Sequence, residues 1–257
     1  MPDRIILSLK YGTRYPADYV NVLFNACRKA MRGPFRFVCL TDDATGLVKG
    51  VEALPIPDVG LTPQEWYRGG IWPKLGIYDR ALHGLSGRCL FIDLDMVVLG
   101  DLDSFFDQPG SFIGINETSA WGRDPTGKPK LCSAIIAFDA GSLSDLAEGF
   151  RANKADILSR FRTEQDYTAA TLPDISYWPD DWVISFKRRL RRPIGVDLLL
   201  QPKAPPAGTK VLAFHGTPRP IDLISRDKWF WDRFPHLAHG RVDWMARYWL
   251  DNGGTLP

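Results

Sequence analysis

Two carboxylates separated by one residue, Asp93 and Asp95, close an apolar run that begins at Arg88. If the backbone stays extended there, both side chains reach the same side, because successive side chains of a strand alternate between faces. Paired carboxylates suit hard divalent cations such as Mg²⁺ or Mn²⁺, which keep coordination positions open for phosphate oxygens. The spacing therefore predicts a metal site beside a phosphate-bearing substrate.

A second Asp-x-Asp pair, Asp101 and Asp103, stands in a different setting. It follows Gly100 and precedes Ser104-Phe105-Phe106, which is the pattern of a turn and a helix start. At such positions aspartates accept hydrogen bonds from backbone N–H groups. Because so short a pattern recurs by chance, its context decides, and we predict that this second pair is structural.

Polar residues also follow the first and the last strand-like runs. Gly12 lies in a strand-to-helix turn where backbone amides could approach a ligand, within the run Lys10-Tyr11-Gly12-Thr13-Arg14-Tyr15. His215 could be a metal ligand, and Gly216 beside it permits close approach of a phosphate. An ordinary turn and a structural histidine are the alternatives, and the residues alone leave both open.

The elements that position these residues alternate along the chain. Strand-like runs are predicted at 5–10, 35–41, 51–56, 88–95, 111–116, 134–139 and 211–215, and helices at 17–31, 73–85 and 142–161. This alternation predicts an α/β fold with a mainly parallel central sheet flanked by helices. Ligands of such sheets bind outside the carboxyl ends of the strands, where the polar residues fall.

Two connections stand out between these elements. The segment 116–130 is rich in glycine, proline and charge, and we expect it to be a long loop that binds substrate. The proline-rich segment 202–208 is expected to be a surface connection, not a domain boundary.

Composition limits the classes of protein that fit. The chain of 257 residues is 45% hydrophobic, so it can bury one substantial core, and its net charge of +2 argues against a nucleic-acid partner. No signal-peptide pattern is present, and no run of 18 apolar residues could span a membrane. Free buried thiols in a reducing cytoplasm are expected for the widely spaced cysteines Cys27, Cys39, Cys89 and Cys132.

Taken in order, these segments resemble the nucleotide-sugar-dependent glycosyltransferases of the GT-A fold. The closest likeness is to the retaining group that combines an Asp-x-Asp strand with a C-terminal His-Gly-x-x-Lys-Pro motif. The resemblance covers roughly residues 5–220. It rests on the 10–15 turn, Thr41-Asp42-Asp43, Trp72-Pro73-Lys74-Leu75, Asp93 and Asp95, Glu164-Gln165-Asp166, Ser185-Phe186-Lys187, and His215-Gly216-Thr217-Pro218-Arg219-Pro220.

The resemblance implies a single GT-A domain over residues 1–257. Its nucleotide-binding part is about 1–100, and its acceptor-binding and C-terminal part is about 101–257. By resemblance, Mn²⁺ or Mg²⁺ is held by Asp93, Asp95 and His215. The donor is contacted by Lys10, Tyr11, Gly12, Thr13, Tyr15, Asp42, Lys74, Asp93, Leu94, Gly216 and Arg219, the last replacing the family's lysine with a different donor geometry.

Glu164 and Gln165 look like the acidic residue and glutamine that face the donor sugar in this group. The acid would hold sugar hydroxyls, and the glutamine would face the anomeric carbon. A helix start capped by Thr163 is the alternative, and both can hold at once. The implied reaction transfers a hexosyl unit, with retention, from a nucleoside diphosphate sugar, expected to be UDP-linked, to a hydroxyl of a glycan, lipid-linked or other acceptor.

Other interpretations remain open. Asp93 could be the nucleophile of a haloacid-dehalogenase-like phosphatase, or the tryptophans could serve a non-catalytic sugar-binding protein. Lys74 and Lys187 could be exposed lysines instead of phosphate contacts. The helical segment 240–250 places Trp244, Met245, Tyr248 and Trp249 on one side, either for peripheral contact with the inner face of a membrane or to cover the core.

Overall fold

The computed structural model describes residues 3–122, 127–225 and 230–257. Part of the predicted substrate loop, residues 123–126, and Trp229 lie outside the described residues. In the described part, the elements in chain order are β1 (Arg4–Lys10), α1 (Ala17–Ala30), β2 (Arg36–Thr41), β3 (Val51–Leu54), α2 (Pro63–Trp66), η1 (Trp72–Tyr78), η2 (Leu82–Gly84), β4 (Arg88–Ile92), β5 (Met96–Val98), α3 (Asp103–Asp107), β6 (Phe112–Asn116), α4 (Glu117–Trp121), β7 (Leu131–Asp139), α5 (Ser144–Arg160), α6 (Glu164–Thr171), β8 (Ser176–Tyr177), β9 (Val183–Ser185), η3 (Phe186–Leu190), η4 (Val196–Leu198), β10 (Val211–Ala213), η5 (Pro220–Leu223) and α7 (Asp243–Asp251).

The central sheet has seven strands in the order β3-β2-β1-β4-β7-β6-β8. Strand β1 pairs in parallel with both β2 and β4, and β3 and β8 add further parallel pairs. Only β7 runs against its neighbours β4 and β6. The predicted α/β class with a mainly parallel sheet flanked by helices is confirmed.

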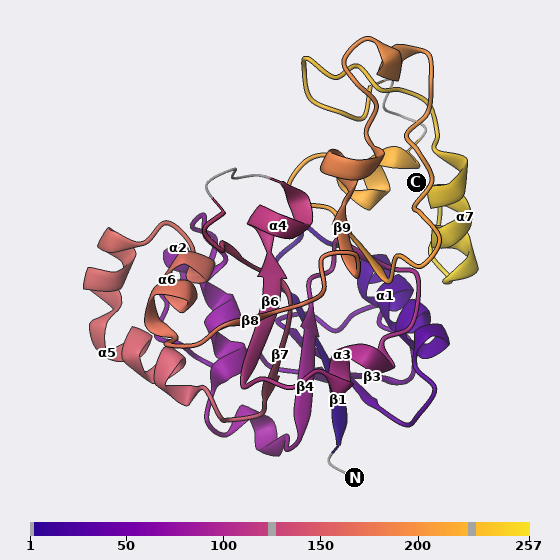
Figure 1. Cartoon of the computed structure of the whole chain (residues 1–257). Helices are drawn as coiled ribbons and strands as arrows, with labels where there is room; N and C mark the ends of the chain where they lie inside the picture. Colours follow the sequence, from indigo (N-terminus) through magenta and orange to yellow (C-terminus); the bar gives the residue numbers. More distant parts are fainter. Residues whose placement is uncertain (1–2, 123–126, 226–229) are drawn as a thin grey trace.

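Strands in the middle of the sheet are apolar on both faces because helices cover both. In β4, Leu90 and Ile92 join one core cluster together with α1, while Cys89 and Phe91 join the other together with η1 and α5. This alternation follows the two-residue period of a strand. Figure 1 shows the sheet between α5 on one side and α1 on the other.

The largest difference from the predicted elements lies at the acidic pair. The predicted strand 88–95 is shorter than expected: β4 ends at Ile92, and residues 93–95 form a turn. Strand β5 then begins at Met96, in a separate three-stranded sheet of order β5-β10-β9. The N–H of Met96 donates to the Asp93 carbonyl at 3.1 Å, which closes a turn. The backbone is therefore not extended through Asp95.

Two other predictions need correction. The segment 73–85 is not one amphipathic α-helix but the short 3₁₀ elements η1 and η2, all seven residues of η1 being buried. The predicted loop 116–130 begins with helix α4, since the Asn116 side chain accepts from the Thr118 N–H and starts a helical turn. Helices α1 and α5 agree with the predictions for 17–31 and 142–161.

The C-terminal helix α7 packs on the core. Met245, Ala246 and Trp249 are buried against the cluster that contains α1 and the second sheet. The apolar side of the segment 240–250 is thus largely used inside the protein. Among the described residues, no helix is both long and apolar enough to cross a bilayer. All four cysteines are buried and free.

The second Asp-x-Asp pair has the structural role predicted for it. One Asp101 carboxylate oxygen accepts from the Asp103 N–H at 3.2 Å, and the other accepts from the Ser104 hydroxyl. Asp103 in turn accepts from the Arg4 guanidinium and from the Arg32 N–H. These contacts fix the start of α3 far from the first acidic pair.

We expect the substitution Asp101→Ala to lower the free energy of unfolding by about 1 kcal/mol at pH 7, as loss of a helix-start cap does. The hydrogen bond from Ser104 lowers the pKa of Asp101 below its ordinary value of 3.8. The stabilisation is therefore present above pH 3.8 and is lost as the pH falls through the lowered pKa. Urea unfolding at pH 7 and at pH 3 measures it; an equal difference at both would contradict this assignment.

Candidate active site

Two adjoining cavities open at the carboxyl ends of β1 and β4. Their volumes are about 330 Å³ and 280 Å³, and they share the wall formed by Gly70, Ile71, Asp93 and Asp95. We call them together the cleft. The larger one is completed by Leu9, Tyr11, Gly12, Thr13, Arg14, Tyr15, Tyr67, Arg68, Gly69 and Leu94. The smaller one is completed by Lys74, Met96, Glu117, Cys132, Ser133, Ala134, Thr163, Glu164, Gln165, Phe214, His215 and Gly216.

The turn after β4 places both acids in the shared wall. The Asp93 N–H donates to the Ala134 carbonyl at 2.8 Å, which fixes the turn against β7. Asp95 accepts a hydrogen bond from the Tyr15 hydroxyl at 3.1 Å. The sequence correctly placed the pair at a strand end, but it is a turn, not an extended strand, that presents both carboxylates.

Lys74 is fully buried, so the alternative that it is an exposed helix lysine is wrong. Its ammonium lies 3.2 Å from the Asp93 carboxylate and 3.7 Å from that of Glu164. It also donates to the Ser133 carbonyl at 2.7 Å and stands over the Phe91 ring. One buried cation therefore balances two carboxylates from distant parts of the chain.

Glu164 and Gln165 open helix α6, where Thr163 caps the Asp166 N–H. Ser133 on β7 joins both: its hydroxyl donates to Glu164 at 2.6 Å, and its N–H donates to the Gln165 side-chain oxygen at 2.9 Å. The second Glu164 oxygen, Oε2, is buried and has no hydrogen-bond partner. The capped helix start is thus present, and the same residues also line the smaller cavity.

The acids of the cleft resist ionisation. Burial raises the pKa of Glu164 and of Asp93, although the Lys74 ammonium opposes the rise in each. Burial and the neighbouring Asp93 charge raise the pKa of Asp95 to about 7. Burial alone would lower the pKa of Lys74, but Asp93 and Glu164 raise it above its ordinary value, so the lysine stays protonated. One buried ammonium thus stands beside three acids, and their negative charge, when all three are ionised, lacks full compensation.

The turn after β1 forms the floor of the larger cavity. Gly12 has φ of +61°, and a Cβ there would lie 2.8 Å from the Tyr67 ring, so a side chain would strain the backbone and displace that ring. Asp42 accepts from the Gly12 N–H at 2.9 Å, and Lys10 is buried with its ammonium on the Asp43 carbonyl. Lys10 and Asp42 thus hold the turn and do not line the cavity, whereas residues 11–15 do.

His215 reaches the smaller cavity through the second sheet. Met96 of β5, the residue after Asp95, pairs with Ala213 of β10, two residues before His215. The Ser185 hydroxyl lies 2.8 Å from His215 Nε2, and the Trp121 ring stacks on the imidazole at 5.0 Å. This pairing of β5 with β10 brings the histidine to the acidic turn.

The rest of the last motif is divided between the cleft and its surroundings. Gly216 lines the smaller cavity, and the Lys187 ammonium donates to the His215 carbonyl at 2.6 Å. Arg219 lines neither cavity; its guanidinium contacts the Arg14 carbonyl at 3.2 Å and Asp222 at 3.5 Å. Arg219 therefore links the last motif to the first turn.

The three predicted metal ligands line one cavity but are not gathered around a point. Within residues 3–122, 127–225 and 230–257, no three His, Cys, Asp or Glu side chains form a cluster that could hold a metal ion. Asp93 is engaged by Lys74, and His215 Nε2 by Ser185. Their donor types still suit Mg²⁺ or Mn²⁺, and the incompletely balanced charge of Asp95 favours a cation there.

Sequence reasoning missed Ser133 and the segment 67–71. Ser133 has no local signal, since its contacts come from α6 and η1. The Gly69-Gly70 pair is a turn signal that was available. At Gly70, where φ is +111°, a Cβ would lie 2.5 Å from the Arg162 carbonyl, so this position beside both cavities requires glycine.

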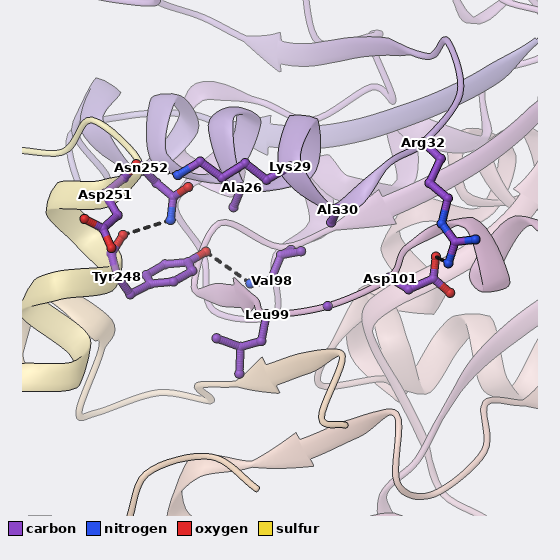
Figure 2. Close-up of a pocket in the computed structure, with 11 residues that line it drawn as sticks. Ala26, Lys29, Ala30, Arg32, Val98, Leu99, Asp101, Tyr248, Asp251 and Asn252 are labelled. Carbon is purple, nitrogen blue, oxygen red and sulfur yellow. Dashed lines mark hydrogen bonds and ion pairs between the residues drawn. The ribbon is translucent and has the colours of Figure 1, made fainter. Parts of the chain in front are cut away.

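A separate cavity of about 440 Å³ lies between α1, the segment after β5 and the end of α7 (Figure 2). The Tyr248 hydroxyl accepts from the Val98 N–H at 3.1 Å in its wall. None of the predicted site residues lines it. We therefore place the chemistry in the cleft.

We expect Asp95→Asn to stabilise the protein at pH 8 without added metal, raising Tm by about 2–5 °C. The folded-state pKa of Asp95 is raised from 3.8 to about 7, so its contribution to stability is fully present below pH 3.8 and is lost as the pH rises through 7. Calorimetry at pH 8 and pH 5 measures this, with a smaller difference at pH 5. A variant that melts below the natural protein at pH 8 would contradict it.

We expect Lys74→Met to lower the free energy of unfolding by about 3–5 kcal/mol at pH 8, because it leaves two buried carboxylates without their cation. Adding Glu164→Gln should recover part of the loss. Urea denaturation measures both, and the exposed Lys49→Met is the matched control with a change near zero. Equal effects of the substitutions at positions 74 and 49 would show that the charge balance does not matter.

No profile of a known protein family matches the chain, and no curated protein sequence matches it. Solved structures do. The glycosyltransferase GlyE of Streptococcus pneumoniae TIGR4 matches with a TM-score of 0.60 and 13% identity, over 96% of this chain and 61% of that chain. The bifunctional glycosyltransferase WbbM matches with a TM-score of 0.59 and 14% identity, over 85% of this chain and 47% of that chain.

The galactosyltransferase LgtC, solved with donor and acceptor sugar analogs, matches with a TM-score of 0.58 and 10% identity, over 98% of this chain and 97% of that chain. The chain thus spans less than two thirds of GlyE and of WbbM, but nearly all of LgtC. At these identities the likeness concerns the fold. The chain has the mixed α/β fold of the GT-A glycosyltransferases.

Proposed function

We propose that this chain is a glycosyltransferase that moves a hexosyl unit from a nucleoside diphosphate sugar, UDP-linked, to an acceptor hydroxyl. The observation that carries the proposal is the meeting of Asp93, Asp95, Glu164, Gln165 and His215 in one cleft. That cleft lies at the carboxyl edge of a sheet whose fold is shared with glycosyltransferases. In this proposal residues 1–257 act as one transferase domain.

Mn²⁺ or Mg²⁺ fits this donor set, with Asp93, Asp95 and His215 as the residues that would hold it. When bound, such a cation supplies Lewis-acid stabilisation of the charge that develops on a departing diphosphate. The Lys74 ammonium opposes the rise that burial causes in the pKa of Asp93, and the Tyr15 hydroxyl donates to Asp95. Both contacts hold the carboxylates toward the place where phosphate charge would lie.

The larger cavity suits the nucleotide. Tyr11 offers an aromatic face in the wall, beside Trp66 at 6.0 Å and Tyr67 at 6.2 Å between ring centroids. Gly12, Thr13, Tyr15 and Leu94 complete the donor contacts, and Asp42 and Lys10 act by holding the turn. Gly216 and Arg219 are proposed to approach the phosphates from the other side, through the backbone and a guanidinium that is always charged.

The smaller cavity suits the transferred sugar. Glu164 Oε2 is buried without a partner, so a sugar hydroxyl that donates to it would satisfy this oxygen. Gln165 is held by Ser133 beside it and is proposed to face the anomeric carbon. Front-face attack with retention fits a site in which Lys74 pairs with Asp93 and with Glu164, so that neither carboxylate is assigned as a nucleophile. An inverted anomeric configuration in the product NMR spectrum would contradict retention.

The acceptor, a glycan, a lipid-linked sugar or another hydroxyl compound, is proposed to approach from the side of residues 101–257.

Four free buried cysteines support a location in a reducing compartment, and we propose the cytoplasm. Contact with the inner face of a membrane belongs to the same proposal.

A haloacid-dehalogenase-like phosphatase would use Asp93 as the nucleophile. In this structure Asp93 is engaged by the buried Lys74, and His215 and Glu164 would have no role in that chemistry. The likeness to three glycosyltransferase structures also supports the transferase.

We expect the protein to release nucleoside diphosphate slowly from one donor of a panel of UDP-, GDP- and other activated sugars, with Mn²⁺ and not with EDTA. Asp95→Asn should lower kcat/KM at least about 100-fold, because a metal ligand and its charge are lost. Release of UDP or GDP is followed by a coupled assay.

The matched control is Asp101→Asn, which alters the structural Asp-x-Asp pair and should leave turnover within about twofold. Hydrolysis of a generic aryl phosphate without donor turnover would favour the phosphatase. Tight donor binding by calorimetry without turnover would favour a sugar-binding protein. Either result would overturn the proposed transferase.

A further inference from the structure

Large apolar side chains are exposed together at one end of the molecule. Leu199 is 85% exposed, Ile194 is 61% exposed and Phe234 is 87% exposed. Val196, Leu198 and Leu200 of the same loop are also exposed. We call residues 194–200 with Phe234 the apolar tip. A concentration of exposed apolar side chains of this kind marks an interaction surface.

The apolar tip is built from two segments, residues 194–200 and residues 234–239, which are joined by buried polar contacts. Asp197 is buried, and its carboxylate accepts from the N–H groups of Gly195 at 2.9 Å and Leu237 at 3.1 Å. It also lies 3.0 Å from His236 Nδ1, and His239 Nε2 lies 2.9 Å from the Leu198 carbonyl. The buried polar contacts hold the loops together and leave the apolar side chains outside.

The surroundings of the apolar tip are strongly basic. Residues 186–203 contain six lysines and arginines and a single acid, the buried Asp197. Two residues before Phe234, the side chain of Asp232 is fully buried and pairs with Arg191 at 2.8 Å. The carboxylates of Asp197 and Asp232 are thus enclosed, whereas the side chains of Arg188, Arg189, Lys203 and Arg233 are exposed. Arg241 is exposed too, but it pairs with the exposed Asp243 at 3.7 Å.

An apolar centre with a basic rim matches the interface of an anionic bilayer. Apolar side chains enter the boundary of the acyl chains, while lysine and arginine lie at the level of anionic headgroups. The exposed cations beside the apolar tip share one sign, which a surface of anionic headgroups complements. The charge complementarity favours the lipid surface.

We propose that residues 194–200 and Phe234 are a membrane-docking tip that inserts into the interface of an anionic lipid bilayer. This is a different surface from the apolar side of α7, whose Met245 and Trp249 are buried in the core. The segment that leads to the tip, η3, follows Ser185, which contacts His215 in the wall of the cleft. Figure 1 shows the orange and yellow segments projecting beyond β9, away from the central sheet.

The experiment is flotation of the full chain with vesicles of phosphatidylcholine alone or with phosphatidylglycerol added. We expect flotation with the anionic vesicles only, weakened by high salt, which screens the basic rim. Leu199→Ser/Phe234→Ser should lower the partition coefficient at least about tenfold. The double substitution Arg188→Gln/Arg189→Gln should lower the partition coefficient about fivefold for each arginine removed.

The matched control is Leu250→Ser, which removes a half-exposed leucine of α7 and should leave flotation unchanged. Circular dichroism confirms that each variant is folded. Failure of the natural protein to float with anionic vesicles would overturn the proposal, as would an equal loss in the Leu250→Ser variant. A dimer in light scattering that the tip variant abolishes, without vesicle binding, would assign the tip to a second copy. This inference rests on the membrane contact included in the proposed function and names the surface that makes it. No sugar donor enters the assay, so its outcome is independent of the proposed transferase activity.

Discussion

The ammonium of Lys74, enclosed without solvent exposure between Asp93, Glu164 and Ser133, is the contact on which the geometry of the cleft depends. Each partner comes from a different element: the turn after β4, the start of α6, and β7. A buried cation is stable only among anions and hydrogen-bond acceptors, and buried carboxylates equally need a cation. These segments therefore hold one another in place, and none could move alone without leaving a buried charge uncompensated.

The second constraint is that the chain passes from the central sheet to the second sheet at the acidic turn. Strand β4 belongs to the central sheet, and β5 pairs with β10 in the second sheet. Asp93 to Asp95 lie between them, so the two sheets meet where the carboxylates are. His215 follows β10, and the same pairing that ends the turn brings the imidazole to it. The proposed catalytic groups are thus a direct result of how the sheets are joined.

Outside the cleft, aspartates form internal contacts, while apolar and basic side chains remain exposed. Near the proposed docking tip, the buried carboxylates of Asp197 and Asp232 contact His236 and Arg191 and hold the loops together. Arginines and leucines of the same loops are exposed. Around α3, Asp101 and Asp103 serve the same internal purpose. The same residue type is structural at these places and proposed to be functional at Asp93 and Asp95, and only its surroundings separate the two cases.

Much of this protein follows from local sequence pattern. Two-residue alternation and apolar runs were enough to predict most strands of the central sheet, α1, α5 and the mainly parallel class. The strand-end positions of residues 10–15, Asp93 and Asp95 were also enough to predict one cleft, because parallel strands end at the same edge. His215 reaches this cleft through the second sheet instead. Context beside Gly100 separated the structural Asp-x-Asp pair from the other one.

Tertiary structure alone decided the rest. The burial of Lys74, the role of Ser133 and the turn at Asp93 depend on contacts between residues far apart in the chain, which leave no trace in local periodicity. The surroundings of α7 also depend on the tertiary structure: its apolar side could have faced a membrane, but it packs on the core. The apolar side chains from Ile194 to Leu200, in contrast, are exposed. Periodicity states which side of an element is apolar; only the assembled fold determines what covers it.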